Sequence, residues 1–295
     1  LALGLALGGA ALARCPAGYV DAHAHLMAVE ARGGGRLEPN PAGASQAALR
    51  VMEHLGMGTL LVMPPPFTSG QEDRFDAEEL ALATKAHAGR LYFLAGGGSL
   101  NLMIQQAVAE GRVSEELRAR FVARAEAIVA LGARGFGELA AEHLSFRPEH
   151  PYIAAPPDHP LFLLLADLAA KHGLPMDLHM EAVATDMPLP DDLGRPNPPR
   201  LRANIDALER LLAHNRQAKI IWAHAGWDNT GHRDAALCRR LFHAHPNLYM
   251  SFKLDKRRGL PVNKPLDREG RLRPEWLELI RAHPGRFIPV SYTHL

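Results

Sequence analysis

Short apolar runs along the chain alternate with longer segments in which apolar residues recur every three or four positions. The short runs predict eight strands, at residues 18–22, 58–63, 91–95, 133–138, 174–179, 219–224, 247–252 and 286–290. The longer segments predict seven helices, at residues 44–55, 76–88, 114–131, 160–172, 201–214, 233–244 and 274–282. Repeated strand–helix units indicate a parallel sheet, and eight units is the number that closes a barrel. We therefore expect an α/β fold, a (β/α)8 TIM barrel.

The chain contains no Gly/Ser-rich linker between residues 14 and 290, so we predict one barrel domain over 14–290. The proline-rich stretch 185–200 predicts one long loop after the fifth strand. The sequence stops soon after the eighth predicted strand, and its last residues, "SYTHL", do not continue the pattern. We therefore expect a barrel that lacks its final helix and the end of its eighth strand, with 291–295 as a foreign tail. We expect such a fragment to be inactive.

Residues 1–13, "LALGLALGGAALA", are apolar, rich in small side chains, and end in A-L-A. This pattern resembles the apolar region and cleavage site of a secretory signal peptide, and it is too short to span a bilayer. It predicts a partial signal peptide and a periplasmic or secreted protein. The alternative is an ordinary Ala/Leu-rich helix in a cytoplasmic protein.

Composition narrows the class of partner. Lys and Arg together number 33 and Asp and Glu 32, so no charge excess favours nucleic acid or an anionic membrane surface. The two cysteines, Cys15 and Cys238, can form neither a disulfide framework nor a zinc site by themselves. We therefore expect a small-molecule substrate, with neither nucleic acid nor a membrane span, and a homo-oligomer stays open.

The chain holds 16 histidines, and two pairs of them are spaced as H-x-H. His243 and His245 fall at a predicted helix end, where residues two apart do not face each other. His23 and His25 follow a predicted strand, where residues two apart point to the same side. Only the strand pair is therefore predicted to grip one ion. Histidines at predicted helix ends, expected to bond the last carbonyls of their helices, are His54, His87, His172, His214, His245 and His283.

Four histidines stand at the ends of three predicted strands: His23 and His25 after the first, His179 at the fifth and His224 at the sixth. In a βα barrel the carboxyl ends of the strands converge on one mouth, where active sites lie. Neutral imidazole suits Zn, Ni, Fe and Cu, and three protein ligands plus water make a catalytic zinc site. The pattern therefore predicts a metal site at this mouth.

These residues also carry a family resemblance. "VDAHAHL" at the first strand, the histidine ending the fifth and "HAGW" ending the sixth resemble the amidohydrolase superfamily of metal-dependent hydrolases over residues 18–290. The amidohydrolase-related branch, which also contains metal-dependent decarboxylases, is the nearest in pattern. The resemblance implies that His23, His25 and His179 bind one or two divalent ions, with Zn2+ the favoured metal. It implies that His224 is a second-metal ligand, or a group that polarises the substrate or orients the water.

Two further residues are candidates at the mouth. Glu138 ends the fourth predicted strand, where binuclear members of the superfamily carry a carboxylated Lys or a Glu that bridges two metals. It could also accept a proton beside a cation, and the alternative is a carboxylate paired with a nearby arginine. Lys253 ends the seventh strand and is predicted to hold a substrate carboxylate, the alternative being a solvated loop charge.

Softer candidates complete the picture. The glycines of "AGGGSLN", residues 95–101, predict either close approach of the backbone to a ligand or a flexible loop. The superfamily places an Asp at the end of the eighth strand as metal ligand and general base, and "RFIPVSYTHL" contains none. Histidines predicted to lie in surface loops are His143, His150, His159 and His232.

The favoured function is hydrolysis of a C–N, C–O or related bond in a small molecule by metal-activated water. The first alternative is metal-dependent decarboxylation of an unsaturated or aromatic carboxylic acid on the same scaffold. The second, from another class, is a non-catalytic metal-binding or ligand-binding barrel. One fold supports many functions, so the residues of the site must decide among them.

Overall fold

The computed structural model describes the backbone of residues 20–24 and the chain over 41–71, 75–146, 151–253 and 263–289. The predictions for residues 1–13 and 291–295, for Cys15, for His150, and for the end of the eighth strand lie outside the described residues.

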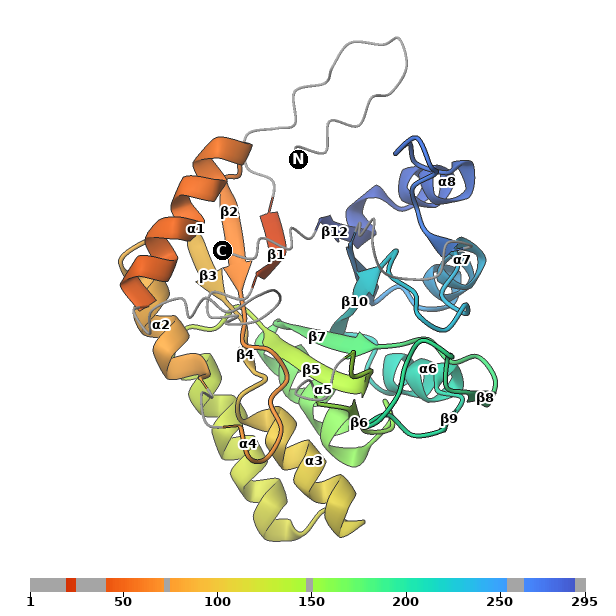
Figure 1. Ribbon diagram of the computed structural model, residues 1–295. Helices are drawn as coiled ribbons and strands as arrows, with labels where there is room; N and C mark the ends of the chain where they lie inside the picture. The colour runs from red at the N-terminus through yellow and green to blue at the C-terminus, as the bar shows by residue number, and fades with distance from the viewer. Residues whose placement is uncertain (1–19, 25–40, 72–74, 147–150, 254–262, 290–295) are drawn as a thin grey trace.

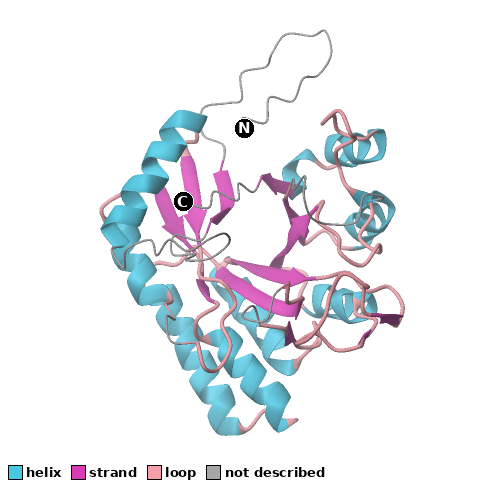
Figure 2. Cartoon of the chain, viewed as in Figure 1, coloured by secondary structure: helices cyan, strands magenta, loops and turns pink. Residues whose placement is uncertain are grey.

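Parallel strands form the inner layer and helices the outer layer (Figures 1 and 2). The main strands are β1 Val20–Ala24, β2 Thr59–Val62, β3 Leu91–Phe93, β4 Ala95–Gly96, β5 Phe136–His143, β7 Pro175–Met180, β10 Lys219–Ala225, β11 Leu248–Phe252 and β12 Phe287–Pro289. The helices are α1 Pro41–Leu55, α2 Ala77–Lys85, α3 Leu100–Glu110, α4 Glu115–Ala130, α5 Pro160–His172, α6 Ile205–His214, α7 Ala235–Ala244 and α8 Pro274–Ala282, with a 3-10 turn at Pro284–Arg286.

The strands follow one another in chain order. Hydrogen bonds join β1, β2 and β3 in one set and β4, β5, β7, β10, β11 and β12 in another. Only Leu94 separates β3 from β4, and β1 lies in contact with β12 at the other junction. The order is therefore that of a (β/α)8 barrel, and the α/β prediction is confirmed. Within the described residues, the hydrogen-bonded ladder does not run across the β1–β12 junction.

Sequence pattern explains both layers. Strands covered on both faces read as continuous apolar runs, and in β10, "KIIWAHA", every residue after Lys219 is buried. Helix α6 buries one stripe, which includes Leu208, Leu211 and Leu212. Side-chain caps fix helix starts: the Ser114 hydroxyl accepts from the amide of Leu117 at the start of α4.

The apolar core is continuous between the strands and the helices, with Trp222, Phe121, Phe136 and Phe162 among its largest fully buried side chains. A second, smaller cluster is separate from it and is built from residues that follow β5 and β7 in the chain. We call this smaller cluster the roof. Its buried members are Leu144, Val183 and Leu201, and Phe146, Tyr152, Met187, Leu189 and Leu193 pack against them.

Three details differ from the sequence prediction. Helix α3 was not predicted, because its start follows three glycines that read as a loop. Strand β5 continues five residues beyond Glu138, to His143, so His143 lies in a strand and not in a loop. The stretch 185–200 is not entirely loop, because β8 Met187–Pro188 pairs antiparallel with β9 Arg200–Leu201; the other short strand, β6 Ile153–Ala154, pairs with β5.

The predicted helix-end histidines do lie at or just after helix ends, but three of them have partners on another helix. A helix that ends beside its predecessor brings its last turn to the side chains of that helix, and a carboxylate there is a stronger acceptor than a carbonyl. The pairs are His172 of α5 with Glu126 of α4 at 2.9 Å, His214 of α6 with Asp167 of α5 at 3.0 Å, and His245 after α7 with Glu209 of α6 at 3.1 Å. No helix in the described part of the chain is long and apolar enough to cross a membrane.

Candidate functional site

Glu138 lies in β5 with its side chain almost fully buried, at 2% exposure. Its amide donates to the carbonyl of Pro64 at 3.1 Å, which holds this part of β5 against the segment after β2. Gly97 packs against the same two segments, where an added Cβ would lie 2.5 Å from the Pro65 oxygen and 2.8 Å from the Glu138 oxygen. Gly97 therefore admits close approach of neighbouring backbone, and the approach of a ligand to "AGGGSLN" stays a prediction.

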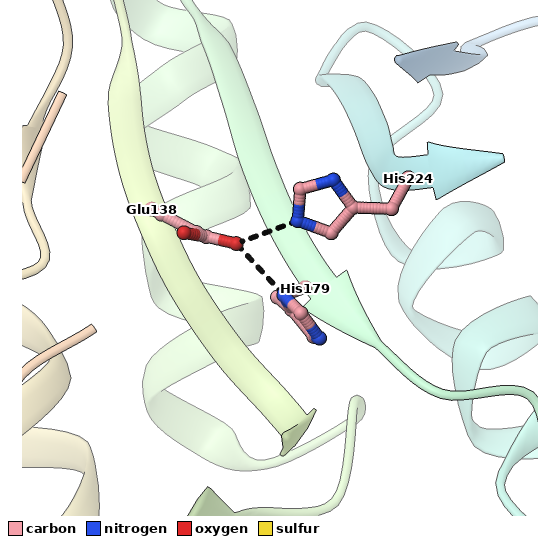
Figure 3. A group of neighbouring side chains, drawn as sticks. All are labelled: Glu138, His179 and His224. Atoms are coloured by element: carbon pink, nitrogen blue, oxygen red, sulfur yellow. Dashed lines mark hydrogen bonds and ion pairs between the residues drawn. The ribbon is translucent and has the colours of Figure 1, made fainter. Parts of the chain in front are cut away.

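The carboxylate of Glu138 is the point at which two histidines meet (Figure 3). Nδ1 of His179, on β7, lies 2.8 Å from Glu138 Oε1, and Nε2 of His224, on β10, lies 3.2 Å from the same oxygen. Strands β5, β7 and β10 are successive neighbours in the sheet, so side chains at matching heights on them can meet. The three residues expected at the mouth from separate strands are thus brought together.

His224 has an unusual backbone. Its φ is +65°, a left-handed conformation that non-glycine residues rarely adopt and that costs roughly 1–3 kcal/mol. Its amide donates to the Ser251 hydroxyl at 2.9 Å, and its carbonyl accepts from the Trp227 amide at 2.9 Å. Gly226 completes the turn, where a Cβ would lie 2.7 Å from the Lys253 oxygen. This turn points the imidazole at Glu138 instead of along the strand.

Charge at the centre follows from burial and from two carboxylates. Burial disfavours the charged imidazole of His179, but Glu138 and Glu181 outweigh it and raise the pKa of His179 to about 9. Burial raises the pKa of Glu142 to about 7, although the Tyr152 hydroxyl that donates to it acts the other way. Burial, reinforced by the charge of Glu138, also holds the pKa of Asp177 well above its ordinary value. His179 and the neighbouring carboxyls of Glu142 and Asp177 therefore each hold a proton to a higher pH than they would in water.

The donor set suits a divalent cation. Glu138, His179 and His224 each offer one ligand atom, and these atoms all lie within 4.8 Å of one another. Two imidazole nitrogens and one carboxylate oxygen are ligands that zinc and related metals accept. The described residues therefore fit a metal of this class.

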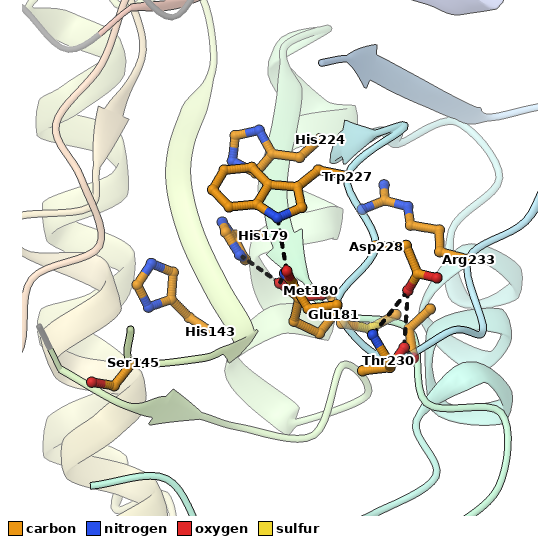
Figure 4. A network of polar contacts seen from close by, with 12 residues as sticks. His143, Ser145, His179, Met180, Glu181, His224, Trp227, Asp228, Thr230 and Arg233 are labelled. Carbon is orange, nitrogen blue, oxygen red and sulfur yellow. Dashed lines mark hydrogen bonds and ion pairs between the residues drawn. The ribbon is translucent and has the colours of Figure 1, made fainter. Parts of the chain in front are cut away.

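A second layer of polar groups surrounds these three (Figure 4). The His143 ring lies 4.5 Å from that of His179, centroid to centroid, and is half-buried. Its prediction as a surface residue is wrong, because β5 extends far enough to carry it inward. His159, predicted as a surface loop residue, instead caps α5, where its Nδ1 accepts from the Leu161 amide at 3.2 Å.

Lys253 follows β11 and is 4% exposed, so the alternative of a solvated loop charge is wrong. Its Nζ lies 2.9 Å from the centroid of the Trp227 ring, a cation–π contact. Phe146 stacks on the same indole at 5.8 Å, and the His224 ring lies 6.0 Å from it. Trp227 thus connects the roof, a cation and the three-residue centre, and sequence reasoning missed it, although it belongs to the quoted "HAGW".

The first-strand histidines cannot be compared in the same way. His23 lies in β1 by its backbone, but its side chain and all of His25 are outside the described residues. Glu181 and Asn229, which contact the centre or its neighbours, were not predicted. Their only sequence signal is their position, since each follows closely after a candidate histidine.

Comparison with known proteins rests on structure alone. No family model matches the chain. No curated protein matches its sequence.

Solved structures do resemble it. A Saccharomyces cerevisiae dihydroorotase in complex with 5-fluoroorotic acid aligns with a TM-score of 0.50 and 14% identity, covering 93% of this chain and 69% of the other. A candidate 2-pyrone-4,6-dicarboxylic acid hydrolase from Pseudomonas putida aligns at 0.49 and 16%, covering 94% and 84%. A dihydroxybenzoic acid decarboxylase from Polaromonas sp. JS666, with bound manganese and an inhibitor, aligns at 0.47 and 13%, covering 94% and 86%. At these identities the dihydroorotase match supports a shared fold, and chemistry must come from the residues.

Proposed function

We propose that this chain is a metal-dependent hydrolase of the amidohydrolase superfamily that cleaves a C–N, C–O or related bond of a small molecule. One observation carries the proposal: the imidazoles of His179 and His224, near the carboxyl ends of β7 and β10, both face one carboxylate oxygen of Glu138 in the neighbouring strand β5. In a βα barrel that end is where catalytic groups gather. The fold shared with a dihydroorotase is consistent with it.

His179 would hold a divalent ion, Zn2+ for preference, together with His23 and His25 as the sequence resemblance implies. Glu138 and His224 lie where they could bind the same ion or a second one. When bound, such an ion supplies Lewis-acid activation of water and of a substrate oxygen. The site would hold two ions if Glu138 were shared between them, and one ion otherwise.

The protein groups would divide the remaining work. Glu138 accepts a proton from the attacking water as its oxygen bonds to the substrate carbon, and delivers that proton to the leaving nitrogen or oxygen as the old bond breaks. His224 Nε2 points into the same space and can donate a hydrogen bond to the oxygen on which negative charge develops. Lys253, buried beside Trp227, offers a positive charge for a substrate carboxylate.

Metal content and product chemistry together test this function. We expect the purified chain, stripped with chelator and dialysed against Zn2+, to retain at least one equivalent, and His179→Ala and His224→Ala to retain less. His243→Ala is the matched control, because its histidine lies at the end of α7. Where protein with a complete barrel turns over a panel of amides and lactones in 18O-labelled water, the label should appear in the product. Wild-type protein that retains no metal would contradict the proposal.

A decarboxylase is the second candidate, favoured by one observation. The buried ammonium of Lys253 beside an aromatic wall suits an unsaturated or aromatic carboxylate, the kind of group that a decarboxylase expels. Release of CO2 without 18O incorporation would identify this reaction. Metal retention without any turnover would instead indicate the non-catalytic binding barrel.

A further inference from the structure

We propose that Glu181, held by Asn229, is a positioning residue that fixes the His179 imidazole for metal binding. The inference rests on the proposed function, since it concerns how the candidate metal centre is kept in place. Glu181 directly follows β7 and is 6% exposed. A buried carboxylate is costly unless it has hydrogen-bond partners, so its placement calls for a physical reason.

Side-chain contacts give that reason. Glu181 Oε1 lies 3.9 Å from Nε2 of His179, the ring nitrogen opposite the one that faces Glu138. The same Oε1 accepts a hydrogen bond from Asn229 Nδ2 at 2.7 Å. The Trp227 indole donates to Asn229 Oδ1 at 2.8 Å, which fixes the direction of the amide. The carboxylate oxygen that faces His179 is therefore held from behind.

The backbone of this segment is fixed as well. The Glu181 amide donates to the Glu142 carbonyl at 2.9 Å, and the Glu181 carbonyl accepts from Asn204 Nδ2 at 2.9 Å. The Thr230 hydroxyl donates to the carbonyl of the next residue, Ala182. Three separate elements thus hold Glu181, which leaves its carboxylate little freedom to turn away.

These contacts form a closed ring, of which Figure 3 shows Glu138 between His179 and His224, and Figure 4 shows Glu181 beside His179. They run from the His224 side chain through Glu138, His179, Glu181 and Asn229 to the Trp227 indole. The Trp227 amide then donates to the His224 carbonyl, which closes the ring. His224 and Trp227 both lie at the carboxyl end of β10, so the contacts hold His179 relative to the same backbone that orients His224. This arrangement suits a site in which two imidazoles must keep a fixed relative geometry.

The chemistry assigns each ring nitrogen a task. A neutral imidazole has one N–H and one lone pair, and a carboxylate only accepts. With the N–H of Nε2 directed at Glu181, the lone pair of Nδ1 is directed at the space shared with Glu138 and His224. Ligating histidines commonly donate their other N–H to a carboxylate in this way, and loss of that carboxylate typically weakens metal binding about 10–100-fold.

The rival explanation is that Glu181 only stabilises the fold. The two explanations differ in what they predict for a folded variant. Replacing a purely structural residue lowers the melting temperature and leaves the metal affinity of the protein that remains folded unchanged. Replacing a positioning residue lowers metal affinity even in protein that is fully folded at the temperature of the measurement.

The test measures the Zn2+ dissociation constant by competition with a chromophoric chelator, alongside thermal unfolding of the metal-free protein. We expect Glu181→Gln to weaken binding about 10-fold or more, and Glu181→Asp, which keeps the charge, to recover part of the loss. Glu142→Gln is the matched control, because it removes a similarly buried carboxylate that is bonded to Tyr152. We expect it to weaken binding much less.

Asn229→Ala gives an independent reading if Glu181→Gln does not fold, because it releases the same carboxylate without changing it, and we expect it also to weaken binding. Unchanged affinity in folded Glu181→Gln or, failing that, in Asn229→Ala would overturn the inference and leave the proposed function standing. Equal weakening in Glu181→Gln and Glu142→Gln would also overturn it, since that would be a general effect of charge. Wild-type protein that binds no Zn2+ would overturn the proposed function and the inference together.

Discussion

Gly97 packs against the backbone of Glu138 with no room for a side chain: a Cβ at this glycine would lie 2.8 Å from the Glu138 carbonyl oxygen. The glycine lies between β4 and α3, and the carboxylate lies in β5. The position of the candidate catalytic carboxylate therefore depends on a residue with no chemistry of its own.

Gly97→Ala should shift β5 at Glu138. The nearest atoms to the new Cβ are backbone oxygens, which cannot move aside as a side-chain tip can, so we expect a loss of about 1–3 kcal/mol in unfolding free energy. We also expect weaker metal retention. Gly194→Ala is the control, since nothing lies within 4 Å of a Cβ there. Urea unfolding of the two variants decides the matter, and equal stability would argue against the tight contact.

Asn101 should be one of the most sensitive polar residues in the fold. Its side chain is fully buried, donates to the Phe67 carbonyl at 3.0 Å and accepts from the Ala140 amide at 3.1 Å. Asn101→Leu has similar volume but leaves both backbone groups unpaired, at about 1–3 kcal/mol each. We expect a drop of several degrees or more in melting temperature, measured by circular dichroism. A melting temperature within 1 °C of wild type, about the scatter expected for a neutral surface change, would contradict this role.

Lys253→Met should change substrate binding more than turnover. Methionine keeps most of the apolar stem against Trp227 but removes the charge. We expect KM to rise about 10-fold or more for substrates that carry a carboxylate, and little change for the matching methyl esters, because a charge-assisted hydrogen bond is worth about 1.5–3 kcal/mol. Steady-state kinetics on acid and ester pairs provide the comparison. Equal effects on both members of a pair would remove Lys253 from carboxylate recognition.

Glu209 should contribute stability that disappears in acid. Burial acts to raise its pKa, but His245 and Arg240 outweigh burial and hold the pKa below the ordinary value of 4.5. A carboxylate whose pKa is depressed on folding stabilises the folded state above its unfolded pKa, and the contribution is lost as pH falls through the folded pKa. We expect Glu209→Gln to destabilise the protein at pH 7 and to differ less from wild type at about pH 3. Unfolding curves at both pH values test this, and a pH-independent difference would contradict it.

Cys238 should resist thiol reagents while the protein is folded. It is fully buried in α7, and burial raises the pKa of its thiol to about 12, so the reactive thiolate is scarce at neutral pH. In a Cys15→Ser background we expect no labelling by iodoacetamide in buffer and one label in denaturant, counted by mass spectrometry. Rapid labelling in buffer would show that α7 opens readily.

The order of strands and helices could be predicted because each element carries its own pattern. Continuous apolar runs such as that of β10 indicate buried parallel strands, and their spacing indicates barrel units. Helix α3 escaped prediction because three glycines mask its start, and β5 was predicted too short because "LAAEH" fits a helix as well as a strand. Both errors concern local patterns that two structures share.

The residues of the site also differ in whether a local sequence pattern marks them. Glu138, His179 and His224 could be predicted because each ends a run that is recognisable as a strand, and parallel strands end on one side of a barrel. Glu181 and Asn229 could not, because their hydrogen bond joins residues 48 positions apart and depends on β7 lying beside β10. No local signal in the chain encodes that contact.

The roof and the main core are two separate apolar clusters, so mutations in one are expected to have different effects from mutations in the other. Changes within 144–146, 152 and 183–201 fall on the smaller cluster, whose Phe146 stacks on Trp227 beside His224, so we expect them to alter the surroundings of the centre more than the packing that keeps the strands together. Changes to the large side chains below, such as Trp222, act on folding first. A library aimed at new substrates should therefore be confined to the roof, and one aimed at heat resistance to the core.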